Sequence, residues 1–243
     1  MSDFFHEPAF RLDGYRPASA LVMEMFHDRI AAHETEMSVL AQHHTSDGRQ
    51  SFFILNDTSV IYGVPGEELL VALHITRDAA SQTFTFDSEQ LPLYALAQSW
   101  LLQHHCPASA VSLPRDTGTA PADEMTVALE ERFRDHGNQY SILSSYSGEG
   151  YPTQETVVLL EASDRTVPQP FRILLESTDL RTFTHQLREG VFDTEEAALA
   201  WMDDRSTPLP TATATATAIA TVAMPHLPPA KPAGPTARPG RRR

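Results

Sequence analysis

The stretch that constrains the fold most is "ELLVALHITRDAASQTF", residues 68–84, because a related stretch follows 87 residues later. It aligns without a gap with "ETVVLLEASDRTVPQPF", residues 155–171. The identical pairs are Glu68/Glu155, Val71/Val158, Leu73/Leu160, Gln82/Gln169 and Phe84/Phe171. Short apolar runs bounded by turn residues are typical of β-strands. The alignment predicts an internal duplication, and a chance likeness between short β segments is the alternative.

In the first half, an apolar stripe predicts one long helix over residues 20–44. Its members recur at three-four spacing, which places them on one helix face: Met23, Phe26, Ile30, His33, Met37, Leu40 and His44. "SFFIL" (51–55), a turn at Asn56-Asp57 and "SVIYGV" (59–64) are typical of a hairpin. Residues 68–76 and 82–87 continue an antiparallel sheet, and residues 89–105 return to helix.

The second half repeats that order. Residues 123–136 predict an amphipathic helix, and strands follow at 140–146, 155–163 and 170–177. A last helix spans 193–204, with Asp193 and Glu196 in capping-box positions. Each half closes on a helix that carries one of the two tryptophans, Trp100 or Trp201. We therefore expect an α+β protein of two similar helix–antiparallel sheet–helix halves, residues 1–115 and 120–205.

The segment from 206 to 243 is a low-complexity tail rich in Thr, Ala and Pro. Its small side chains bury too little apolar area to offset chain entropy, so we expect it to be disordered. It is also basic, with a net charge of +6 from residue 205 onward, because all 32 acidic residues precede it.

The body is acidic, since the net charge of −14 for the whole chain leaves −20 on residues 1–204. Such a surface repels phosphate backbones, which argues against nucleic-acid binding by the body. The sequence shows no signal peptide, and no apolar run reaches the roughly 18 residues of a membrane span. One cysteine excludes an internal disulfide. These features predict a cytoplasmic protein that does not bind membranes.

The residues that most resemble a reactive site are His104, His105 and Cys106, at the end of the predicted helix 89–105. Neighbouring side chains on a helix diverge by about 100°, so two adjacent histidines cannot share one metal ion. The same objection applies to His43-His44. Histidines near a helix C-terminus instead favour the negative end of its dipole, which also disfavours a thiolate at Cys106. We interpret the stretch as a helix end with a buried thiol; the alternative is a metal site assembled across elements.

Two weaker patterns are explained without chemistry. Glu24 and His27 have the ExxH spacing of di-iron bundles, but the second motif that such sites need is absent. "SSYSGEG" (144–150) lies between two predicted strands and matches no phosphate-binding or hydrolase motif, so we interpret it as a hairpin turn. The sequence therefore predicts no metal and no cofactor, and it assigns no catalytic residue.

Three functional hypotheses remain. The first is a non-catalytic intracellular protein of adaptor or chaperone type that binds a protein partner or forms a homodimer through the stripe on helix 20–44. The second is an enzyme, for example a hydrolase, built from His74, Asp57 and one of the paired histidines. The third assigns the function to the basic tail, as an arm that contacts an acidic partner. We favour the first.

Overall fold

The computed structural model describes residues 8–59, 66, 68–112, 118–148 and 150–211. These residues belong to one compact unit that extends to Thr211. The tail prediction for 212–243 and most of the predicted strand 59–64 lie outside the described residues. Within the described ranges, no helix has the length and apolar character needed to cross a membrane.

Residues 16–103 form the first sheet and its helices. The helices are α1 (Ala20–Arg29), η1 (Ala31–Glu36) and α2 (Tyr94–Gln103). The strands are β1 (Arg16–Pro17), β2 (Met37–His44), β3 (Gln50–Asp57), β4 (Leu70–Asp78) and β5 (Thr83–Leu91). Sheet A has the order β1-β5-β4-β3-β2, and only the two-residue β1 pairs in parallel. A short helical turn, η3 (Ala108–Ala110), follows α2.

Residues 120–203 build the second sheet with the same order of elements. The helices are α3 (Glu124–His136), η4 (Gly137–Gln139) and α4 (Glu195–Asp203). The strands are β6 (Ala120–Pro121), β7 (Tyr140–Gly148), β8 (Thr153–Ala162), β9 (Phe171–Asp179) and β10 (Thr184–Phe192). Sheet B has the order β6-β10-β9-β8-β7, again with the two-residue strand parallel. The α+β class is thus confirmed, with two mixed five-stranded sheets.

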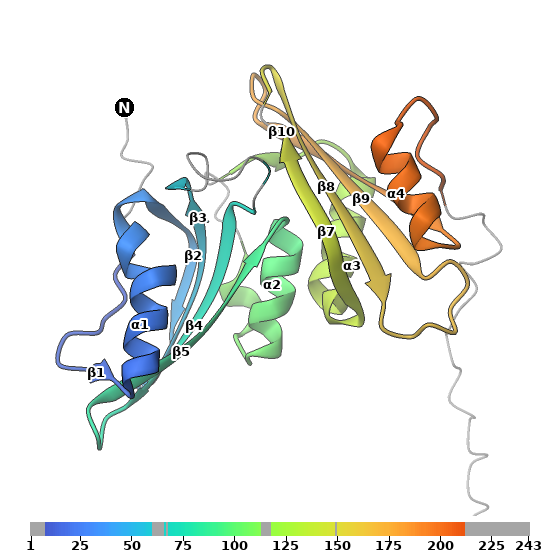
Figure 1. Cartoon of the computed structure of the whole chain (residues 1–243). Coiled ribbons are helices and arrows are strands. Elements are labelled where there is room, and N and C mark those ends of the chain that lie inside the picture. Colours follow the sequence, from blue (N-terminus) through green and yellow to red (C-terminus); the bar gives the residue numbers. More distant parts are fainter. Residues whose placement is uncertain (1–7, 60–65, 67, 113–117, 149, 212–243) are drawn as a thin grey trace, which may run out of the picture. The chain divides into compact units, whose positions relative to one another are not determined.

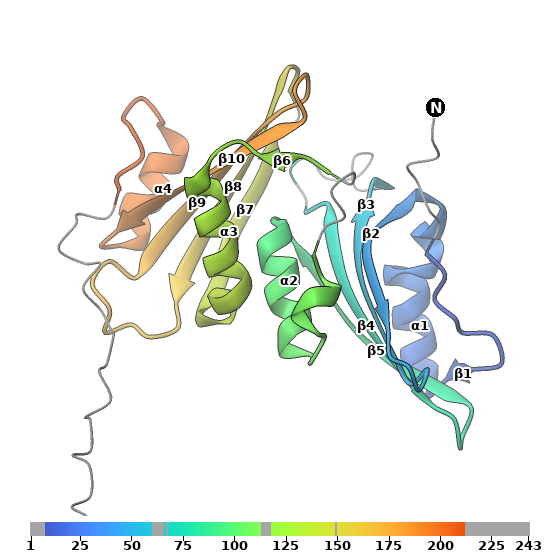
Figure 2. The same cartoon turned by 180° about the vertical axis from the view of Figure 1, so that it is seen from behind.

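The helices cover the sheets in layers, which Figures 1 and 2 show from opposite sides. Phe26 of α1 packs with Phe53 and Leu73 on one face of sheet A. The other face of sheet A shares one apolar cluster with α2, α3 and one face of sheet B. Trp201 of α4 covers the far face of sheet B, against Val157 and Ile173. Because strand side chains alternate between faces, odd and even residues of β3 and β4 enter different clusters.

The predicted helix 20–44 is wrong beyond Arg29. Residues 37–44 form strand β2, although their apolar residues also fit a helical repeat. A register shift between Val39 and Ala41 changes which face the following residues point to. That bulge interrupts the strict alternation that identifies a strand, and no proline or glycine marks the helix end. The dimer seam proposed for this helix therefore loses its basis.

Other predicted elements are corrected at their boundaries. Asn56 and Asp57 belong to strand β3 instead of a turn, and β3 pairs with β2 and β4. Residues 89–91 end strand β5, so α2 begins only at Tyr94. Strand β10 was not predicted at all. The helices and strands predicted between residues 123 and 177 are confirmed in type.

The two halves correspond at a different offset from the one that their sequences suggest. Ala20 begins α1 and Glu124 begins α3, an offset of 104, while Thr83 and Thr184 begin β5 and β10, an offset of 101. The 87-residue alignment instead places β4 on β8, which occupies a different position in its sheet. The internal duplication therefore stays a prediction, and the alignment of residues 68–84 with 155–171 does not support it.

Residues 207–210, which the sequence analysis assigns to the tail, pack against sheet B. The indole Nε1–H of Trp201 donates to the Thr207 carbonyl at 3.1 Å, and Val191 N–H donates to the Pro210 carbonyl at 2.9 Å. Leu209 joins the apolar cluster under α4. The body therefore extends past the predicted boundary at residue 206, held by Leu209, one hydrogen bond from a side chain and one backbone hydrogen bond.

Candidate functional site

One row of side chains crosses four strands of sheet A. His43 of β2 pairs with Phe52 of β3, Phe52 pairs with His74 of β4, and His74 pairs with Asp87 of β5. The rings of Phe52 and His74 stack in parallel with centroids 4.5 Å apart. Since directly opposed residues on adjacent strands share a face, the register brings His74 beside the Asp87 carboxylate.

Helix α2 adds a second histidine to this row at its C-terminus. His104 is the C-cap of α2, and its ring stacks on Trp100 with centroids 3.8 Å apart. The rings of His104 and His74 lie 5.5 Å apart between centroids. His104 Nδ1 lies 2.9 Å from the Trp100 carbonyl oxygen. Because a carbonyl only accepts, this nitrogen carries the proton and the lone pair of His104 is on Nε2.

His74, Asp87 and His104 form one cluster of donor atoms, here called the His–Asp cluster. One ligand atom from each of the three lies within 4.8 Å of the other two. His74 Nδ1 is buried and has no hydrogen-bond partner within the part of the chain that the structure describes, while Nε2 lies 3.4 Å from the Thr76 hydroxyl. Burial lowers the pKa of His74, and the repulsion that would arise between protonated His74 and His104 rings lowers it further, against the opposing effect of Asp87. The imidazole of His74 is thereby kept neutral.

The rest of the predicted histidine–cysteine stretch is structural. His105 adopts φ 65°, and the N–H groups of His105 and Cys106 donate to the carbonyls of Leu102 and Leu101. This pattern is a Schellman motif, which satisfies carbonyls at a helix end. Cys106 is 4% exposed, and burial raises the pKa of its thiol to about 12. The interpretation of a helix end with a buried thiol agrees with this geometry.

The neighbouring pair His43-His44 is divided by the sheet. The ring of His43 stacks near Phe52, while the ring of His44 meets Phe53 on the opposite face. His44 Nδ1 lies 2.7 Å from the Ser51 hydroxyl. The expectation that adjacent histidines do not converge agrees with this arrangement, although the cause is strand alternation instead of helical rotation.

Asp57 belongs to a separate, acidic hollow of about 670 Å³. Asp57 is buried and lies on the face of sheet A that α1 covers, in the alternation of Phe53 and Leu55. His74 lies on the opposite face. The carboxylates lining the hollow are Asp28, Asp57, Glu68 and Glu89. Arg29 and His33 are its basic side chains.

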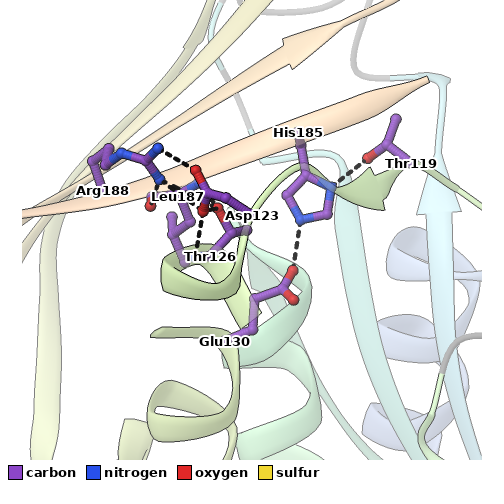
Figure 3. A network of polar contacts seen from close by, with 7 residues as sticks. All are labelled: Thr119, Asp123, Thr126, Glu130, His185, Leu187 and Arg188. Atoms are coloured by element: carbon purple, nitrogen blue, oxygen red, sulfur yellow. Dashed lines mark hydrogen bonds and ion pairs between the residues drawn. The ribbon is translucent and has the colours of Figure 1, made fainter. Parts of the chain in front are cut away.

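Sheet B carries a second polar network, between α3 and β10 (Figure 3). His185 Nε2 lies 2.6 Å from Glu130 of α3, and His185 Nδ1 lies 2.8 Å from the Thr119 hydroxyl. Burial lowers the pKa of His185, but the hydrogen bond to Glu130 and the nearby Glu176 carboxyl outweigh it and raise the pKa. In a catalytic triad Nε2 faces the nucleophile, whereas here Nε2 faces the carboxylate.

The same network fixes the start of α3. Asp123 is the N-cap and accepts from the Thr126 N–H and hydroxyl, both at 2.8 Å. Arg188 of β10 pairs with Asp123, as Figure 3 also shows. The hydrogen bond from Arg188 holds the pKa of Asp123 well below its ordinary value. This part of the network anchors α3 on sheet B.

Helix α1 presents an apolar face to solvent. Leu21 and Met25 are 63% and 37% exposed, and Asp28, which lines the acidic hollow, follows on the same face. Spacings of four and three residues place these three side chains in one row. The exposed apolar row therefore leads into the acidic hollow.

Comparison of the chain with protein-family models, curated proteins and solved structures finds no match. The structure brings together His74 and one of the paired histidines, His104, and it separates both from Asp57. Asp87, Glu130 and His185 were missed by sequence reasoning. The only signal for Asp87 is its register opposite His74, which depends on the length of the turn between β4 and β5.

Proposed function

We propose that this protein is a non-catalytic interaction protein of adaptor or chaperone type that binds a basic, amphipathic segment of another protein. The observation that carries the proposal is the exposed row of Leu21 and Met25 on α1, which leads through Asp28 into the acidic hollow.

The apolar row on α1 and the acidic hollow together favour a partner segment that is both apolar and basic. Exposed apolar side chains beside charged ones are typical of protein-binding surfaces, where apolar anchors provide most of the affinity. Among the described residues that line the hollow, four carboxylates face one arginine. With −20 on residues 1–204, the surface attracts lysine- or arginine-rich segments and speeds their association.

The enzyme hypothesis named His74, Asp57 and one of the paired histidines as candidates. His74 and His104 lie together, but Asp57 lies on the opposite face of sheet A from His74, so the three do not form one site. We therefore advance no second candidate function from that set.

The test compares two pairs of exposed residues at the starts of α1 and α3. The full chain, immobilised, is used to capture partners from the extract of its own cells. We expect Leu21→Ser with Met25→Ser to reduce capture by about tenfold, as for the loss of a binding anchor. Glu89→Lys should reduce capture through charge, and capture by the wild type should weaken with salt.

The matched control is Met125→Ser with Val127→Ser, because these residues are also exposed, at 60% and 38%, in the first turn of α3. The control should capture the same partner as the wild type. Equal loss in both pairs would contradict the proposed surface. A body that is monomeric and captures nothing would contradict the proposed function.

A further inference from the structure

We propose that His74, Asp87 and His104 bind a divalent transition-metal ion of the Zn²⁺ type. No sequence motif predicts this site, because its three ligands come from separate elements: β4, β5 and the C-cap of α2. It is independent of the partner-binding surface on α1.

The distances suit a metal after small side-chain movements. The three donor atoms lie within 4.8 Å of one another. Zn²⁺ with bonds near 2.1 Å separates tetrahedral ligands by roughly 3.3 Å, so rotations that move the donors by roughly an ångström close the site. Asp87 is exposed and free to make this adjustment.

Both imidazoles have a lone pair available for an ion. The Trp100 carbonyl fixes His104 in the tautomer whose Nε2 is unprotonated. Ligating histidines commonly bond a backbone carbonyl through their other nitrogen in this way. His74 Nδ1 is buried and has no hydrogen-bond partner among the described residues. Among the described residues, His74 therefore keeps one ring nitrogen that no protein group engages, and a metal bond could use it.

The surroundings hold the two rings in place. His74 stacks on Phe52, one of the fully buried side chains, and His104 stacks on Trp100. Packing of this kind limits rotation of a ligand before the ion arrives, which lowers the entropic cost of binding.

The donor set defines the class of ion. Two imidazoles and one carboxylate suit Zn²⁺, Co²⁺ or Ni²⁺, whereas Ca²⁺ and Mg²⁺ prefer sites made of oxygen alone. Three protein ligands leave a further coordination position for water or another small ligand.

The experiment titrates the untagged full chain with Co²⁺, followed by visible absorption, and then displaces Co²⁺ with Zn²⁺. We expect one ion per chain and a higher melting temperature with Zn²⁺, since an ion that binds only the folded state stabilises it. Asp87→Asn and His104→Gln should each lower the affinity for Co²⁺ at least about tenfold. Losing a residue that only supports a metal ligand already costs about tenfold in affinity, and these two residues are ligands themselves.

The controls are His105→Gln and His43→Gln. His105 adjoins His104 in sequence, and His43 lies two strands from His74 in the same row. Neither belongs to the cluster, so both variants should bind as tightly as the wild type. Asp87→Asn alters an exposed side chain, so its circular dichroism should stay that of the wild type.

Two results would overturn the assignment. One is Co²⁺ binding that is equal in the wild type, Asp87→Asn and His104→Gln. The other is the lack of saturable binding of one ion per chain at concentrations up to about 1 mM, which marks weak affinity.

Discussion

His105 has a backbone conformation that its side chain disfavours. Its φ of 65° lies in the left-handed region, where a Cβ atom costs roughly 1–2 kcal/mol. The conformation persists because the N–H groups of His105 and Cys106 both bond carbonyls of α2. Glycine is the residue that helix ends most often use at this position.

We therefore expect His105→Gly to raise the free energy of unfolding by about 1 kcal/mol, measured by urea denaturation. His105→Ala keeps the Cβ atom and should give no such gain, so it is the matched control. If both variants were stabilised equally, the gain would come from removing the imidazole ring and not from relieving the backbone conformation.

At the residue scale, part of the histidine–cysteine stretch was predictable. Divergence of adjacent side chains and the end of a helix follow from local geometry, so the roles of His105 and Cys106 were accessible. The meeting of His104 with His74 and Asp87 was not, because it depends on a strand pairing 13 residues apart and on how α2 packs over that pair.

Among the elements, β9, β10 and α3 bring three titratable side chains together, Glu176, His185 and Glu130. Glu176 of β9 faces His185 and Glu130 from the neighbouring strand. Burial raises the pKa of Glu176 to about 7 from an ordinary 4.5, helped by the Glu130 charge and opposed by His185. Between pH 4.5 and about 7, Glu176 therefore stays protonated in the folded state but is ionised in the unfolded chain.

This difference fixes the sign of the pH dependence. A carboxyl whose pKa is raised by folding destabilises the fold as the pH rises from its unfolded to its folded pKa, about 4.5 to 7 here. Glutamine carries no such proton. We expect the stability of Glu176→Gln relative to the wild type to increase from pH 5 to pH 8, measured by urea denaturation.

Comparison between the two proteins at each pH is needed because other groups act in the opposite direction. Burial lowers the pKa of His44 to about 4, so His44 adds stability as the pH rises toward 6.5. Glu34→Gln, in exposed η1, is the control for the substitution itself, and the change between pH 5 and pH 8 should be larger for Glu176→Gln than for this variant. If the difference in unfolding free energy between Glu176→Gln and the wild type stayed constant from pH 5 to pH 8, it would contradict the raised pKa of Glu176.

The elements also show where pattern reading succeeds. Helix α3 was predicted because its apolar residues recur at helical spacing, and in the structure Asp123 caps it. Strands β2 and β10 were missed for different reasons: a bulge disturbs the alternation of β2, and β10 mixes Arg188 and Glu189 into its run. Those charges are satisfied by Asp123 and Arg132, which only the fold brings near.

In the whole molecule, the two sheets share a core as well as an order of strands. Helices α2 and α3 lie in one apolar cluster with residues of both sheets, so neither half completes this cluster alone. The strand orders of the two sheets match, and each sheet has a bulge at a corresponding place, Val39/Ala41 in β2 and Ile142/Ser144 in β7, while the internal duplication itself stays a prediction. The sequence alignment matched β4 with the wrong strand, β8. Buried strands all consist of the same few apolar residue types, so their sequences resemble one another whatever their position in the sheet.

One close approach between the halves within this core is at Gly137, which follows α3. A Cβ atom added there would lie 2.8 Å from the Cβ and Oγ of Ser99 on α2 and 3.3 Å from Leu96. Its φ of −57° is ordinary for any residue, so alanine would strain packing and leave the backbone unstrained. Ser99 is 4% exposed and has little room to move.

Gly137→Ala should therefore lower the free energy of unfolding by about 1–3 kcal/mol, the usual cost of overpacking a core. Ser99→Gly removes the opposing atoms, so in the double variant alanine at position 137 should cost much less than it does alone. This non-additivity is the signature of direct contact, and a double-mutant cycle in urea measures it. Additive effects would mean that α2 and the end of α3 are not in contact, and that the two sheets do not share a close-packed core at this point.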